Sequence, residues 1–158
     1  VGNILLVLLL FLLAACDSKK MQTITELGKT YEESGIKITA TDIITLPLKE
    51  SSTKKDYVAV AVKFVVNNDS DSVFRIGSSF MDVYVDDVLV QSRGIVSDAN
   101  RDKLPGGIIS GSIAPGKRAE GYWIVDVPKD TRQIEMISKI QYENFVSFVF
   151  DVPPLTME

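Results

Sequence analysis

The 158-residue chain has no histidine and a single cysteine, Cys16. Histidine is the commonest general base and the commonest transition-metal ligand, so its absence removes every His-dependent catalytic triad and most transition-metal sites. One cysteine provides no internal disulfide, which many small secreted modules use, so the domain must be stable through its hydrophobic core. The formal net charge of −4 argues against a nucleic-acid partner.

The chain also has no apolar run long enough for a comfortable membrane span. Residues 4–15 are twelve apolar residues without a charge, whereas a spanning helix needs about 20. Such a run is typical of the hydrophobic core of a secretory signal peptide. Signal peptides usually begin with Lys or Arg, and residues 1–3 contain neither, so the sequence leaves the true start of the protein open.

The run ends in Leu13-Ala14-Ala15-Cys16, which resembles a bacterial lipobox. In that signal a diacylglycerol group is attached to the thiol of Cys16, and a peptidase cuts between Ala15 and Cys16. The resemblance implies a signal peptide at 1–15 and anchoring at the extracytoplasmic face of the cell membrane. Two acyl chains anchor a protein stably, and we expect no cofactor besides this covalent lipid. The alternative is an ordinary buried cysteine in a short hydrophobic helix.

Beyond the signal, the sequence predicts a tether and then one domain. Residues 17–30 are polar and show little apolar periodicity, so we interpret 16–30 as the lipidated cysteine and a flexible tether. Apolar residues alternate with polar ones from Gly35 onward, which is typical of half-buried strands. We therefore expect the folded domain at 31–158.

The clearest strand lies at 57–66, where every second residue is apolar and most are β-branched. Several short strands separated by turn signals predict an all-β sandwich of about 7–9 strands. The apolar face of the clearest strand is Val58, Val60, Val62, Phe64 and Val66. The expected strands are 36–40, 57–66, 73–76, 80–85, 88–90, 108–113, 118–127, 134–140 and 144–152.

A series of short segments carries a family resemblance. They are Gly28-Lys29-Thr30-Tyr31, Gly35-Ile36-Lys37-Ile38-Thr39, residues 57–68, Ser79-Phe80, Ala114-Pro115-Gly116-Lys117, Gly121-Tyr122-Trp123 and residues 126–130. This order is similar to the DUF4352 family of bacterial surface lipoproteins over about residues 28–152. The resemblance implies an immunoglobulin-like antiparallel β-sandwich related to the mycobacterial secreted antigen MPT63. The family has no agreed catalytic residues, so none is carried over to this chain.

The strand at 118–127 makes three local predictions. Gly121 follows a Pro-Gly turn and is expected to permit close approach of another backbone. Trp123 shares a face with Val125 and is expected in the core. Tyr122 then faces outward, where it is a candidate for a partner surface. In the hairpin at Asp86-Asp87, relatives often have Asp-Gly, and the missing glycine predicts a different turn type.

Acidic residues are the main candidates for a metal site. Carboxylates that converge at loop tips can bind Ca²⁺, which takes 6–8 oxygen ligands. The candidates are Asp69, Asp71, Asp82, Asp86 and Asp87. No EF-hand loop is present and solvated turns explain these residues better, so we predict no metal site. No strained nucleophile elbow accompanies the serines and lysines, so we predict no catalytic residue.

The longest break between predicted strands, 93–107, is our positional candidate for a contact site. Long loops in compact domains are often functional, and a plain solvated loop is the alternative. The candidate contact residues are Arg93, Asp98, Asn100, Arg101, Asp102 and Lys103.

These features predict a non-enzymatic lipoprotein that displays a monomeric immunoglobulin-like domain. Its expected partners are the membrane, through the lipid, and an unidentified envelope or extracellular protein. The alternative is an extracytoplasmic sensor domain that binds a small ligand or an ion. An apolar cavity between the sheets, or clustered aspartates, would favour this alternative.

Overall fold

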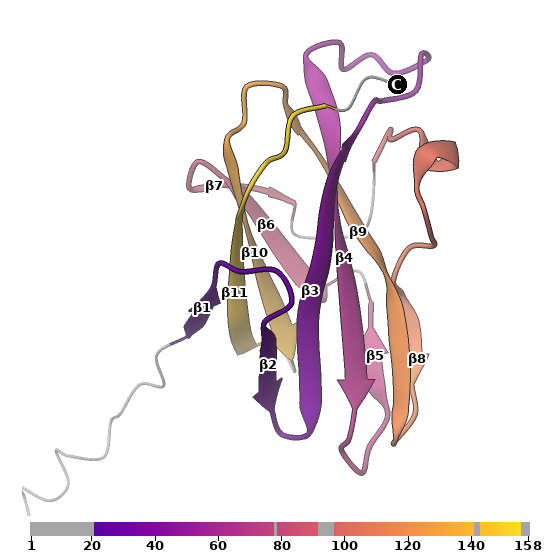
Figure 1. Cartoon of the computed structure of the whole chain (residues 1–158), viewed down its shortest axis with the longest axis vertical. Coiled ribbons are helices and arrows are strands. Elements are labelled where there is room, and N and C mark those ends of the chain that lie inside the picture. Colours follow the sequence, from indigo (N-terminus) through magenta and orange to yellow (C-terminus); the bar gives the residue numbers. More distant parts are fainter. Residues whose placement is uncertain (1–20, 78, 92–96, 141–142, 156–158) are drawn as a thin grey trace, which may run out of the picture.

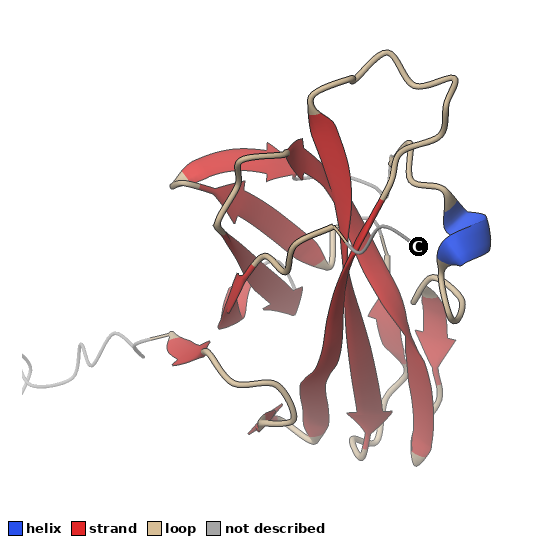
Figure 2. Cartoon of the chain, turned by 45° about the horizontal axis from the view of Figure 1, so that its top comes forward, coloured by secondary structure: helices blue, strands red, loops and turns tan. Residues whose placement is uncertain are grey.

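The computed structural model describes residues 21–77, 79–91, 97–140 and 143–155 (Figure 1). Within them the regular structure is eleven strands and one short 3-10 helix, η2 at Arg101–Lys103 (Figure 2). The predicted all-β sandwich is confirmed. The strands are β1 (Gln22–Ile24), β2 (Thr30–Glu33), β3 (Ile36–Leu46), β4 (Tyr57–Asn68), β5 (Phe74–Ile76), β6 (Met81–Val85), β7 (Val88–Gln91), β8 (Gly111–Ile113), β9 (Lys117–Pro128), β10 (Gln133–Ile140) and β11 (Glu143–Asp151).

The strands form two main sheets that pack face to face (Figure 1). One sheet has the order β1-β11-β10-β6-β7 and the other β2-β3-β4-β9, while β5 and β8 pair separately. The pairs are antiparallel except for β1, which runs parallel to β11. Long β3, β4 and β9 therefore provide one continuous face on which the other sheet packs.

The core forms where the alternating faces of the two sheets meet. The predicted inner face of β4 is buried, and Phe64 at its centre is fully buried. Its ring contacts Phe148 of β11 edge to face, with the ring centroids 5.2 Å apart. Trp123 and Val125 of β9 lie in the same cluster. The prediction that Trp123 faces the core is confirmed, and the period-two pattern of β4 is the physical reason for the sandwich.

The prediction of a tether at 16–30 is wrong from Gln22 onward. Strand β1 adds to the edge of the five-stranded sheet, and Ile24 is completely buried opposite Phe148. Strand β2 then pairs with β3 and buries Tyr31. The domain therefore starts before residue 31, and only β1 and β2 raise the strand number above the expected range.

Two further local predictions differ from the structure. The expected strand at 108–113 begins only at Gly111, because residues 107–109 bond to β9 instead. In the β6–β7 hairpin, Asp86 and Asp87 both have positive φ, 48° and 64°. Positive φ at both central residues is the pattern of a type I′ turn. Asp tolerates this conformation, so the turn is kept without glycine.

Candidate functional site

The segment 97–109 folds back over the outer face of β4 and β9. There it covers a second, smaller apolar cluster that includes Ala59 and Ala61 of β4 and Tyr122 of β9. The two alanine side chains are short, so the covering segment lies close to the sheet. Tyr122 faces outward from the sandwich, as predicted, but it is only 2% exposed. Its availability to a partner surface is therefore ruled out, because the loop covers it.

The hydroxyl of Tyr122 makes a polar contact beneath segment 97–109. It donates a hydrogen bond to Asp42 Oδ2 at 3.0 Å. Burial, together with the neighbouring carboxylate of Asp42, raises the pKa of Tyr122 to about 12. The phenol therefore stays protonated and acts as a fixed hydrogen-bond donor that links β9 to β3.

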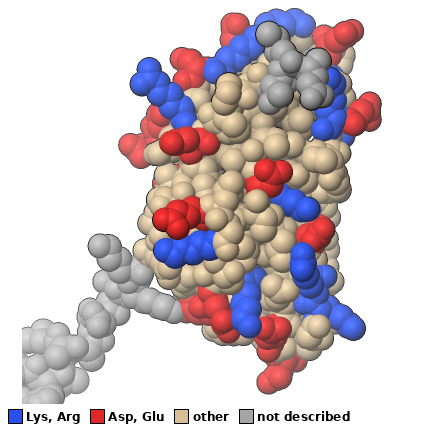
Figure 3. All heavy atoms as spheres, viewed as in Figure 1, with Lys and Arg blue, Asp and Glu red and all other residues tan. Residues whose placement is uncertain are grey.

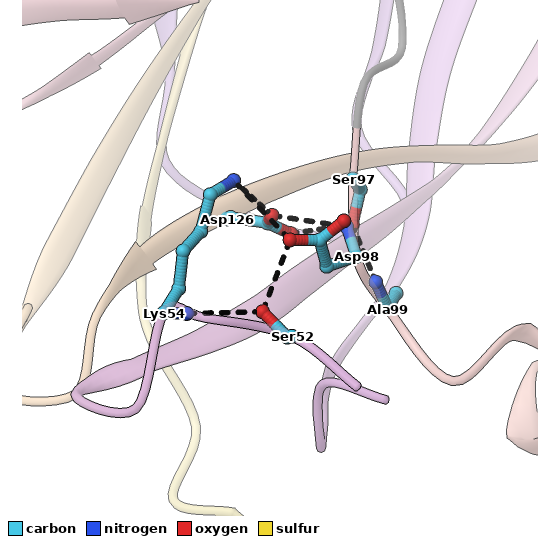
Figure 4. Close-up of polar contacts among 6 residues, drawn as sticks. All are labelled: Ser52, Lys54, Ser97, Asp98, Ala99 and Asp126. Carbon is cyan, nitrogen blue, oxygen red and sulfur yellow. Dashed lines mark hydrogen bonds and ion pairs between the residues drawn. The ribbon is translucent and has the colours of Figure 1, made fainter. Parts of the chain in front are cut away.

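A polar cluster around Asp126 joins segment 97–109 to the loop that follows β3 (Figure 4). The Asp126 side chain is 4% exposed and accepts a hydrogen bond from Lys54 Nζ at 2.7 Å. The backbone N–H of Asp98 donates to the same oxygen, Asp126 Oδ2, at 3.0 Å, and Ser97 Oγ donates to the other oxygen, Oδ1. Ser52 Oγ, from the loop after β3, donates to Asp98 Oδ2 at 3.0 Å. The carboxylate of Asp126 thus connects three segments of the chain.

The arrangement of the Asp126 cluster fits a structural brace. The hydrogen bond to Asp126 raises the pKa of Lys54 above its ordinary value. A lysine that acts as a general base needs the opposite shift. The Ser97 hydroxyl donates a hydrogen bond to Asp126, whose carboxylate also neutralises Lys54. The cluster can therefore hold the two loops together.

Beside this brace lies a cavity of about 250 Å³, here called the lysine pocket. Four of its lining residues are Lys49, Lys54, Lys55 and Lys129. The rest of the lining is mostly apolar, and no Asp or Glu is part of the described lining. These other lining residues are Pro47, Leu48, Ser52, Tyr57, Val58 and Leu155. The pocket is therefore locally positive on a protein whose formal net charge is −4.

The lysine pocket and the entry of the chain lie toward different ends of the sandwich. In Figure 1 the loop after β3 lies at the top, next to the end of the described chain, while β1 lies in the lower half. A second cavity of about 320 Å³ is lined by Ser34 of the β2–β3 turn and by Phe74 and Arg75 of β5. The end that carries the lysine pocket is thus the one away from β1.

The predicted contact loop is packed against the domain only in part. Asp98 belongs to the Asp126 cluster, and the backbone N–H of Asn100 donates to Pro47 O at 2.9 Å. The three residues of η2 are exposed. They are Arg101, Asp102 and Lys103. Arg93, like Ala15 and Cys16, lies outside the described residues.

The lysine pocket itself was missed from the sequence. Three of its lysines lie in segment 49–55, which reads simply as a polar break between strands. Lys129 is far away in sequence and reaches the pocket because β9 ends beside the start of β4, where Lys129 N donates to Asp56 O. The three lysines that are close together in sequence could have indicated a positive site. The fourth, Lys129, joins them only through the pairing of β4 with β9.

The acidic residues considered for calcium are separated in the structure. Asp69 pairs with Lys37 at 2.7 Å, and Asp82 pairs with Lys139. Asp86 and Asp87 are exposed in their turn. In the described part of the chain, no three Asp, Glu or Cys side chains gather in a way that could hold a metal ion. The described acids thus serve ion pairs and turns.

Comparison with known families identifies the domain. The family described as "Domain of unknown function (DUF4352)" matches residues 25–147. The chain belongs to this family. The match begins within the segment 16–30 that the sequence predicts as a tether, and it includes β2, while β1 lies just before it. The name of the family states no reaction, and a comparison with curated proteins finds no match.

Solved structures of other proteins share the β-sandwich fold of this DUF4352 chain. The ycdA protein of Bacillus subtilis subsp. subtilis str. 168, assigned provisionally as a lipoprotein, has a TM-score of 0.58 at 16% identity. That similarity covers 80% of this chain but only 39% of ycdA. The yjhA protein of Bacillus subtilis has a TM-score of 0.56 at 12% identity, covering 84% of this chain and 100% of yjhA. The secreted protein MPT63 of Mycobacterium tuberculosis gives 0.56 at 12% identity, covering 85% and 99%. At these identities the likeness shows the fold alone.

Across the described residues of this DUF4352 chain, the helical structure is too short and too polar to span a bilayer.

Proposed function

We propose that this DUF4352 protein is a lipoprotein, anchored to the extracytoplasmic face of the cell membrane by an acyl lipid on Cys16. The observation that carries the proposal is Leu13-Ala14-Ala15-Cys16 at the end of an apolar run. The provisional lipoprotein assignment of ycdA and the secretion of MPT63 support an extracytoplasmic location. Two acyl chains would suffice for stable attachment.

Substitution of Cys16 tests the anchor directly. Cells that express the full chain and are fed an alkyne fatty acid should label the wild-type protein, and Cys16→Ala should abolish the label because the acceptor thiol is gone. Ser18→Ala, two residues away, is the matched control and should keep the label. A label that survives in Cys16→Ala would show that the anchor is assigned wrongly.

The domain itself is a binding module, and its binding end carries the loops 47–56 and 97–109. Three observations support this end: it bears the lysine pocket, it exposes η2, and it lies away from β1. The protonated Lys54 and the saturated Asp126 support binding over catalysis. The expected partner is an envelope or extracellular protein. The lysine pocket also favours a second candidate function, that of a sensor for a small anion.

Site-specific photo-crosslinking tests which end binds. A photoreactive amino acid at the exposed position Arg101 should give one discrete protein adduct on intact cells. The same amino acid at Lys29, which is exposed beside β2, should not give that adduct. The same adduct from both positions, or no discrete adduct from Arg101, would refute a protein partner at this end.

A further inference from the structure

We infer that the lysine pocket binds an acidic segment of the partner, with a carboxylate among the lysines and an adjacent apolar side chain on the pocket floor. The inference rests on the proposed function, since it names the chemistry of the partner at the same end of the sandwich. It rests on the charge of the pocket, on its apolar lining and on its size.

The positive charge of the pocket is largely uncompensated within the described chain. Lys54 is neutralised by Asp126 and lies 3.9 Å from Asp98. For Lys49, Lys55 and Lys129 no ion pair with a carboxylate is formed among the described residues. The ammonium group of Lys55 donates a hydrogen bond to a backbone carbonyl oxygen, that of Glu50, at 3.3 Å. Three ammonium groups therefore remain to attract an anionic group.

The floor of the pocket is apolar and partly open to solvent. Leu48, Val58 and Leu155 line it together with Tyr57, which is 39% exposed although it is a large aromatic residue. A free inorganic anion gains nothing from such a surface. A peptide segment does, because an apolar side chain next to its carboxylate would bury area against Tyr57.

The size of the pocket favours part of a larger molecule. Ligand pockets for small molecules are typically about 300–1,000 Å³, and this one is about 250 Å³. That volume accommodates one or two side chains of a segment whose remainder lies outside. The long-stemmed lysines at its rim suit this role, since their flexible ammonium groups act as point charges without the fixed geometry of arginine.

The rest of the protein directs an acidic partner to this pocket. The formal net charge is −4, so an acidic segment is repelled by the molecule as a whole. Figure 3 shows acidic and basic side chains interspersed over the visible face, without one broad patch of either sign. A local cluster of lysines then orients the partner as well as attracting it, because an encounter elsewhere on the surface places like charges together.

Peptide binding to the full chain in detergent micelles tests the inference. The probe is a labelled, end-blocked six-residue peptide of alternating leucine and glutamate, followed by fluorescence anisotropy. We expect saturable binding to the wild type, and binding about tenfold weaker to the triple variant K49Q/K55Q/K129Q. The same peptide with glutamine in place of glutamate should bind the wild type as weakly as the glutamate peptide binds the triple variant. Lys54 is left unchanged because it braces Asp126.

The matched control removes the same number of charges elsewhere. K29Q/R75Q/K117Q changes three exposed cations outside the pocket and should leave the peptide affinity within about twofold of wild type. Equal losses in both triple variants would overturn the pocket and indicate unspecific charge attraction. Acetate or inorganic phosphate that competes as strongly as the peptide would overturn the acidic-segment assignment in favour of a small-anion sensor. If the pocket variant fails to bind the peptide differently from wild type while the Arg101 adduct persists, the inference fails and the proposed function stands.

Discussion

Gly121→Ala should lower the free energy of unfolding by about 2–4 kcal/mol, measured by urea denaturation with Trp123 fluorescence. A Cβ at position 121 would lie 2.7 Å from Ile109 N and 2.8 Å from Gly107 O. Both are backbone atoms, so no side-chain rotation relieves the overlap. The segment would have to move away from β9, and the hydrogen bonds from Ile109 N to Tyr122 O and from Tyr122 N to Gly107 O would be lost.

Gly107→Ala is the matched control, because the same chemical change there meets no atom within 4 Å. It should leave stability unchanged or raise it by about 0.4–1 kcal/mol, since alanine restricts the unfolded chain. Equal destabilisation by the two substitutions would contradict the close approach at Gly121. The loss expected at Gly121 is therefore specific to the contact that seats segment 97–109 on the sheet.

The features that the sequence predicted well are those encoded by short-range patterns. Alternation along β4 predicts its buried face, and a glycine within β9 predicts a close backbone approach, which the structure confirms at Gly121. Trp123 is likewise assigned to the core by the residues two positions away on its own strand. Each of these predictions needs only the period of a strand, without knowledge of its neighbours.

The features that were missed depend on contacts between distant segments. Strand β1 has three residues, too few to show a period, and its partner β11 lies more than a hundred residues further along the chain. The second apolar cluster depends on Ala59 and Ala61. Their small side chains give no strong apolar pattern in the sequence, although segment 97–109 packs over them. The lysine pocket combines segment 49–55 with Lys129, and only the pairing of β4 with β9 brings them together.

Asp126→Ala should cost about 2–3 kcal/mol of unfolding free energy, because it removes one acceptor shared by three donors. The substitution leaves the Asp98 N–H and the Ser97 hydroxyl without their acceptor in a partly buried site. Lys54 loses its ion pair but is 39% exposed, so its ammonium group can turn to water, which keeps the cost below that of a fully buried pair. Urea denaturation of the full chain in detergent measures the change.

Asp126→Asn separates the charge from the shape of this brace. The amide fills the same space and keeps one oxygen that can accept a hydrogen bond, but it no longer neutralises Lys54. We therefore expect Asp126→Asn to lower the free energy of unfolding by less than Asp126→Ala does. Asp102→Ala removes an exposed carboxylate from η2 in the same segment and should stay within about 0.5 kcal/mol of wild type. An Asp126→Ala protein as stable as Asp102→Ala would mean that the loops hold their positions without the brace. The expected loss would instead show that the end of the sandwich that carries the lysine pocket is held in place by a residue of β9, on the rigid sheet beneath it.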